Sequence, residues 1–173
     1  MRILWFLSGF AAILSVIALV LSAVVLVTIA SDEDEAEESQ SYIVDRGEFA
    51  VEMVLEALEL YEDEGREETI RFYNTPESTN GEWYVFIIDE SDEIIAHATP
   101  DLLGEDLKGD LFVGADGYRF GEAILEATDR GHWVDYLFEN PATGNQEYKH
   151  SWVVKRDGLI FGSGWYQVLP KSG

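Results

Sequence analysis

The chain contains no cysteine and few basic residues, and each shortage excludes a class of function. Its 173 residues hold 11 Lys and Arg against 34 Asp and Glu, a formal net charge of −23. Without cysteine the chain can form no disulfide, no thiolate metal site and no cysteine nucleophile. Nucleic-acid binding needs a basic face against the phosphates, so we expect no nucleic-acid partner.

The sequence also lacks the short motifs of catalysis and metal binding. Its histidines, His97, His132 and His150, form no HExxH pair or other closely spaced metal motif. It has neither a GxSxG elbow nor a phosphate-binding loop, and carboxylate pairs arise by chance in so acidic a chain. We therefore expect no metal, no cofactor and no enzymatic activity.

A long apolar segment stands at the start of the chain. Residues 3–30 are apolar or small throughout, and a membrane-spanning helix needs about 20 such residues. A cleaved signal usually has an apolar core of only ~7–15 residues, so we expect an uncleaved, single-pass membrane anchor. Secretion after cleavage near Ala30 and a buried core helix are the alternatives. Because Arg2 is the only basic residue before the segment, we expect the rest of the chain to lie outside the cytoplasm, in the periplasm or the extracellular space.

An acidic run follows the apolar segment. Residues 32–38 read DEDEAEE, and so many adjacent carboxylates favour a solvated spacer over a packed element. A calcium site is the other interpretation, but the run lacks the glycine and the ligand spacing of a calcium loop. We predict a membrane anchor or signal segment at 1–30, a spacer at 31–41, one folded domain at 42–169 and a tail at 170–173.

The domain begins with helical periodicity and continues with strand patterns. Apolar residues recur at helical intervals from about Ser41 to Gly65, and short helices are expected at 67–73 and 120–128. The glycine-containing stretch at 99–118 is expected to be a long, structured and functional loop. Strands are predicted at residues 83–88, 94–97, 133–138, 147–154 and 159–166. This order predicts an α+β domain, with helices packed on one side of a five-stranded antiparallel sheet.

Lys149 is the most unusual residue of the predicted strands. It lies in an aromatic-rich segment, and strand alternation places it on one face with Ser151 and Val153. One interpretation is a lysine on the solvated face of an edge strand. The other is a lysine that points into an aromatic pocket and pairs with an anion, since a partly buried ammonium needs a charged partner.

A series of short motifs occurs in the order that is typical of one sensor family. The motifs are Tyr84 with Phe86, Asp89, His97, Leu103-Gly104, Asp116-Gly117, and the segments at 131–136, 140–144, 149–153 and 162–166. Together they resemble the Cache domain family of bacterial extracytoplasmic sensors, in its single-module type 2 form. The resemblance covers roughly residues 42–167, and it implies a PAS-like sheet with a long N-terminal helix packed on it.

The resemblance also implies a binding site. In this family a small ligand, often a short carboxylic acid, lies between the sheet and the loop over it. The implied ligand-binding residues are Lys149, His97, Tyr84, Tyr136, Phe138 and Arg119. Lys149 matches the family's ligand-pairing lysine, and His97 matches the histidine that closes the second strand. The sequence departs from the family where two residues separate His97 from Pro100, and where Trp152 replaces a tyrosine.

We therefore expect an extracytoplasmic small-molecule sensor whose ligand is a short organic carboxylate. No kinase, cyclase or methyl-accepting region follows residue 167. We expect the chain to signal through a membrane partner, or as a homodimer formed by the anchor and the long helix. The alternatives are a structural or interaction protein that keeps the fold without a ligand, and an enzyme.

Overall fold

The computed structural model describes residues 45–114 and 116–167. The predicted anchor at 3–30, the acidic spacer at 31–41 and the tail at 170–173 lie outside the described residues and stay predictions. None of the helices in the described part combines the length and the apolar character that a membrane crossing requires.

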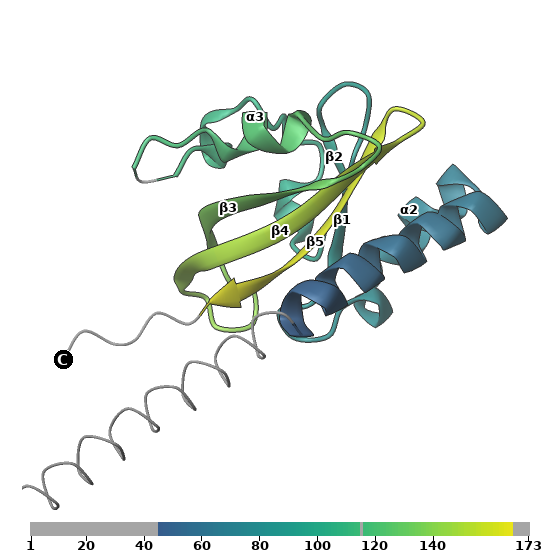
Figure 1. Ribbon diagram of the computed structural model, residues 1–173, viewed down its shortest axis with the longest axis horizontal. Coiled ribbons are helices and arrows are strands. Elements are labelled where there is room, and N and C mark those ends of the chain that lie inside the picture. Colours follow the sequence, from purple (N-terminus) through teal and green to yellow (C-terminus); the bar gives the residue numbers. More distant parts are fainter. Residues whose placement is uncertain (1–44, 115, 168–173) are drawn as a thin grey trace, which may run out of the picture. The chain divides into compact units, whose positions relative to one another are not determined.

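The described residues form one antiparallel sheet of five strands, as the sequence predicts. The strands are β1 (Val85–Ile88), β2 (Ile94–Ala96), β3 (His132–Glu139), β4 (Gln146–Arg156) and β5 (Leu159–Gln167). Their order across the sheet is β2-β1-β5-β4-β3, with β5 in the middle (Figure 1). β1 pairs directly with β5 although the two are far apart in the sequence. This pairing brings Tyr84, just before β1, next to the C-terminal strands.

The described part of the chain has one long helix and two short ones. The first helix occupies residues 45–64, and α2 follows at Arg66–Tyr73. Gly65 separates them with a φ of +82°, which glycine adopts without the strain of other residues. α3, at Phe120–Leu125, is shorter than the predicted 120–128. Short 3-10 turns occur at Pro76–Ser78, Pro100–Leu102 and Asp110–Phe112.

Helices cover both faces of the sheet. On one face, Val54 of the first helix belongs to an apolar cluster with Ile87 of β1. On the other face, Phe120 of α3 belongs to a cluster with Phe86 of β1, and Figure 1 shows the first helix and α3 on opposite sides. The prediction that the helices pack on one side is therefore wrong. The reason is that β1 is buried along its whole length, so both of its faces need an apolar cover.

The layer that contains α3 is here called the lid and consists of residues 99–114 and 116–125. A Cβ atom on Gly121 would lie 2.0 Å from the Leu107 carbonyl oxygen, so glycine allows α3 to pack directly on the preceding loop. An isolated bridge between Glu93 and Asp106 ties that loop to the start of β2. The prediction of a long structured loop is confirmed, and the loop covers the sheet face that carries Lys149.

Candidate ligand-binding site

Strand register places Lys149 in the interior of the sheet. Lys149 on β4 pairs with Tyr136 on β3 and with Tyr166 on β5. The predicted alternation is confirmed, because Lys149, Ser151 and Val153 are all buried. Only 1% of Lys149 is exposed, and β4 is an internal strand. The interpretation as a solvated lysine on an edge strand is therefore wrong.

A chain of hydrogen bonds leads from Lys149 to the backbone of β3. Lys149 Nζ donates to the Tyr84 hydroxyl, and the Tyr84 and Tyr166 hydroxyls lie 3.1 Å apart. The Tyr166 hydroxyl donates to the Glu139 carbonyl oxygen at 3.1 Å. Because that bond uses the only Tyr166 proton, Tyr84 must donate to Tyr166, and Lys149 must donate to Tyr84. An ammonium has three protons to donate, so Lys149 can hold a further acceptor.

Aromatic rings surround the Lys149 ammonium. The distances from Nζ to the ring centroids are 4.0 Å for Tyr84, 5.1 Å for Tyr166, 5.3 Å for Phe86 and 5.8 Å for Phe138. Rings within about 6 Å of a cation attract it through their quadrupoles. This attraction favours the charged form of Lys149 but does not replace a hydrogen-bonding anion.

The described residues offer Lys149 no carboxylate partner. None of their ion pairs involves it. Burial lowers the pKa of Lys149 well below its ordinary value, and the charge of Glu82 acts in the opposite direction. An anion placed beside Nζ would remove most of this penalty, because a buried charge is tolerated when it is paired and hydrogen-bonded.

His97 stands beside the lysine as a neutral group. It is buried, and its Nδ1 accepts a hydrogen bond from the Thr99 N–H at 2.9 Å. The ring proton of the neutral imidazole therefore lies on Nε2. Burial, and secondly the charge of Lys149, lower the pKa of His97 to about 3. The His97 and Tyr84 rings lie edge to face with centroids 4.8 Å apart, so His97 supplies an N–H donor close to the ammonium.

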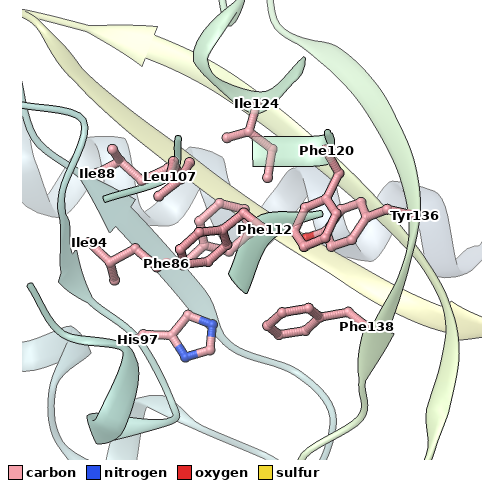
Figure 2. Close-up of a pocket in the computed structure, with 10 residues that line it drawn as sticks. All are labelled: Phe86, Ile88, Ile94, His97, Leu107, Phe112, Phe120, Ile124, Tyr136 and Phe138. Atoms are coloured by element: carbon pink, nitrogen blue, oxygen red, sulfur yellow. The ribbon is translucent and has the colours of Figure 1, made fainter. Parts of the chain in front are cut away.

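A small cavity lies next to these groups, between the sheet and the lid (Figure 2). Its volume is about 20 Å³, and one water molecule needs roughly 10–15 Å³. His97, Tyr136 and Phe138 belong to its walls, and the Tyr136 hydroxyl lies 3.0 Å from Ser151 Oγ. The other lining residues are apolar: Phe86, Ile88, Ile94, Leu107, Phe112, Phe120 and Ile124. The space therefore suits a short apolar group. Lys149 is not one of the lining residues, but its Nζ lies 5.3 and 5.8 Å from the centroids of the lining Phe86 and Phe138 rings.

The structure brings all the predicted site residues together except one. Lys149, Tyr84, His97, Tyr136 and Phe138 form a contiguous cluster on the lid-facing side of the sheet. Arg119 is exposed at the start of α3. Its Nε donates to Glu122 at 2.6 Å, and its guanidinium donates to the Lys108 carbonyl at 2.8 Å. Arg119 therefore lies on the outside of the lid and not at the cavity.

Two residues of the site, Tyr166 and Phe120, are not among those that the sequence predicts. Tyr166 has a usable signal, because the tight turn at 157–158 fixes the β4–β5 register and so sets Tyr166 opposite Lys149. Phe120 stacks on Tyr136 with ring centroids 4.3 Å apart. No local pattern predicts this contact, since a helix as short as α3 does not show which of its faces is buried.

The arrangement is a set of hydrogen-bond donors beside an apolar space. Lys149 and the Nε2–H of His97 can each donate to an anionic oxygen, whereas the Tyr84 proton is already donated to Tyr166. Within the ranges that the structure describes, no group of three histidine or carboxylate side chains could hold a metal ion. The donor set fits a small anion with a short apolar body.

Comparison with known proteins connects this geometry to a family. A family model described as "Cache domain" matches residues 15–167. A search of curated proteins finds no match to the chain.

Solved structures with the same fold include domains of chemotaxis proteins. One is a methyl-accepting chemotaxis protein from Vibrio parahaemolyticus RIMD 2210633, with 17% identity, 76% of this chain and 95% of that chain covered, and a TM-score of 0.61. A periplasmic sensor domain of a chemotaxis protein has 23% identity, 76% and 96% coverage, and a TM-score of 0.56. A Cache chemosensory domain, described with its carboxylic acid recognition, has 19% identity, 79% and 98% coverage, and a TM-score of 0.53. At these identities the likeness shows the fold alone.

Proposed function

The chain belongs to the Cache domain family, and we propose that it is an extracytoplasmic sensor module that binds a short organic carboxylate. The observation that carries the proposal is the burial of Lys149, which is 1% exposed and hydrogen-bonded to Tyr84. No carboxylate of the described residues pairs with it. A buried amine without an anionic partner weakens the fold, so its presence is best explained by a ligand that supplies the anion.

In the proposed complex the ligand's carboxylate is bound by Lys149, with the Nε2–H of His97 as a second donor, while Tyr84 keeps Lys149 in place by accepting one of its protons. Charge-assisted hydrogen bonds of this kind are shorter and stronger than neutral ones. The hydrocarbon part of the ligand packs in the cavity against Phe86 and Phe138, which line it. Because the cavity is only about 20 Å³, the lid must move outward slightly to admit even acetate.

The proposal extends to the segments outside the described residues. Residues 3–30 anchor the chain in the membrane with the domain outside the cytoplasm, and residues 31–41 hold the domain away from the lipid. The ligand state of the domain is then passed to a membrane partner or through a homodimer. A chemosensory Cache domain that recognises carboxylic acids has the same fold, which supports this kind of role.

A thermal-shift screen of the full chain in detergent tests the proposed function. The panel consists of acetate, propionate, pyruvate, lactate, amino acids and amines. We expect one or more carboxylates to raise the melting temperature by several degrees, because a ligand at a hundredfold excess over its Kd stabilises the folded state by about 2.7 kcal/mol. A flat response to every carboxylate would overturn the proposal and favour a structural or interaction role for the same fold.

A further inference from the structure

Two hollows lie on the lid side of the sheet, and Phe138 is a lining residue of both. The inner cavity has a volume of about 20 Å³ and includes His97. An outer groove of about 390 Å³ lies between the lid and the β3–β4 turn, and its walls include Leu102 and Leu111. Phe120 also lines both spaces. A thin aromatic partition therefore separates a very small space from a much larger one.

Phe138 is held in this position by other rings and not by tight burial. It is half-buried, and its ring lies edge to face with Phe120 and Tyr136, at centroid distances of 5.8 and 5.9 Å. The His97 ring lies at 6.4 Å. Figure 2 shows Phe138 beside His97, on the side of the cavity opposite Ile88. Because Phe138 lines both spaces, we expect removal of its ring to open the cavity toward the groove.

The position of Lys149 fixes where a ligand chain would meet this partition. Lys149 Nζ lies 5.8 Å from the Phe138 ring centroid. A ligand whose carboxylate pairs with Lys149 has only a few bond lengths before its chain reaches the ring. Beyond the ring, the groove continues along Leu102, Leu111 and Val113, which are suitable neighbours for a longer aliphatic chain.

We infer that Phe138 sets the upper length of the ligand's hydrocarbon chain by separating the inner cavity from the outer groove. The inference rests on the proposed function and specifies which chain lengths of carboxylate the same site accepts. After the slight outward movement of the lid, acetate or propionate lies on the inner side of the ring, whereas a longer chain must displace the ring. Each methylene group that a pocket accepts or rejects changes affinity by about tenfold or more.

Titration calorimetry of the full chain in detergent tests this inference with acetate, propionate, butyrate and valerate. The variants are Phe138→Ala and Phe138→Leu, of which the second preserves folding if the first does not. Leu111→Ala is the matched control, because Leu111 lines the groove but not the inner cavity. Wild type is expected to bind propionate at least about tenfold more tightly than valerate.

Both Phe138 variants are expected to bind valerate about tenfold more tightly than wild type, with a much smaller change for acetate and no such gain in Leu111→Ala. If wild type binds acetate and the Phe138 variants leave the valerate affinity unchanged, the inference is overturned while the proposed function stands. An equal gain in Leu111→Ala also overturns it, since the groove and not the partition would then limit the chain. Failure of wild type to bind any of the four ligands removes the inference, and the proposed function falls with it only if pyruvate, lactate and the other carboxylates of the thermal-shift panel also fail to bind.

Discussion

Lys149 is the residue at which stability and function conflict. Its side chain is buried and its pKa is lowered, mainly by burial. The unfolded chain keeps the ordinary, higher lysine pKa, so at neutral pH the unfolded state binds the extra proton more readily than the folded state. The sign of this linkage means that Lys149 weakens folding at every pH below the unfolded pKa, and that the penalty disappears only as pH rises through that value.

Replacement of the lysine by an apolar residue should therefore stabilise the protein. We expect Lys149→Met to increase the free energy of unfolding of the ligand-free protein by about 1–3 kcal/mol, because it removes a buried amine and keeps the aliphatic chain. Chemical denaturation of the full chain measures the change. Lys108→Met is the matched control, since Lys108 is exposed and paired with Asp92 on the surface. A loss of stability in Lys149→Met would show that the lysine has a structural role.

The same lysine should make ligand affinity depend on pH. Burial raises the pKa values of Tyr84, Tyr136 and Tyr166, and that of His97 is lowered to about 3, so these four groups stay neutral from pH 5 upward. A bound carboxylate raises the pKa of Lys149 toward its ordinary value, and binding therefore takes up a proton wherever the pH exceeds the lowered pKa.

We expect the affinity for a carboxylate to fall as pH rises from 5 to 9. The measured binding enthalpy should also change with the ionisation enthalpy of the buffer, in proportion to the number of protons that binding takes up. Calorimetry at several pH values, in two buffers with different ionisation enthalpies, measures both effects. Above the pKa of the ligand's own carboxyl, about 4–5, the ligand does not titrate. An affinity that is constant over this range, with no proton uptake, would show that Lys149 is already charged before the ligand binds.

Sequence patterns predict the residues of the site unevenly. Lys149 is found because a lysine inside an aromatic strand is rare, and strand alternation places it on the buried face. His97 and Tyr84 are found only through the family resemblance, since their contact depends on the return of β2 beside β1. Arg119 shows that a residue implied by the family resemblance need not lie in the site, because its hydrogen bonds to Glu122 and Lys108 hold it on the outside of the lid.

At the scale of elements, β5 is the strand that allows the site to form. Its Gly162 lies against the ring of Phe86, which lines the cavity, and a Cβ atom there would be only 2.2 Å from the ring. Gly164 allows the backbone of Ser151 on β4 to approach in the same way. The groups that approach these two glycines are a protein side chain and protein backbone.

Substitution of Gly162 should therefore disturb both packing and binding. We expect Gly162→Ala to reduce the free energy of unfolding by about 1–3 kcal/mol, as overpacking of a core does, because the buried Phe86 ring must shift. Gly47→Ala in the first helix is the contrasting control: its Cβ would meet Trp133 at an ordinary 3.6 Å, and alanine favours a helix by up to about 1 kcal/mol. Thermal unfolding of both variants measures the difference, and a neutral Gly162→Ala would contradict the close packing.

The strands and the long helix could be predicted, whereas their arrangement in space could not. Continuous apolar runs and tight turns mark β1 and the β4–β5 hairpin locally. The pairing of β1 with β5 joins distant parts of the chain, and no local pattern contains it. The side on which α3 packs is equally non-local, because it depends on the apolar face of the sheet that the first helix leaves uncovered.

For the whole molecule, the large negative charge and the buried lysine must be considered together. The net charge is −23, and this would repel an anionic ligand at low ionic strength. At about 0.15 M salt the Debye length is roughly 8 Å, so most surface carboxylates do not act on the site. The local surroundings of Lys149 contain donors, and no carboxylate in the described part of the chain forms an ion pair with it. We therefore expect these surroundings to decide the sign of the ligand that the site prefers.

The most direct test is calorimetric titration of the full chain and its Lys149→Met variant with the carboxylate that gives the largest thermal shift. The variant should remain folded and be at least as stable as wild type, so that a change in binding reflects the site itself. We predict that its affinity falls at least a hundredfold, about 2.7 kcal/mol, because the carboxylate loses the cation with which it is proposed to pair. Equal affinities of the two proteins would contradict the assignment of Lys149 as the group that binds the ligand.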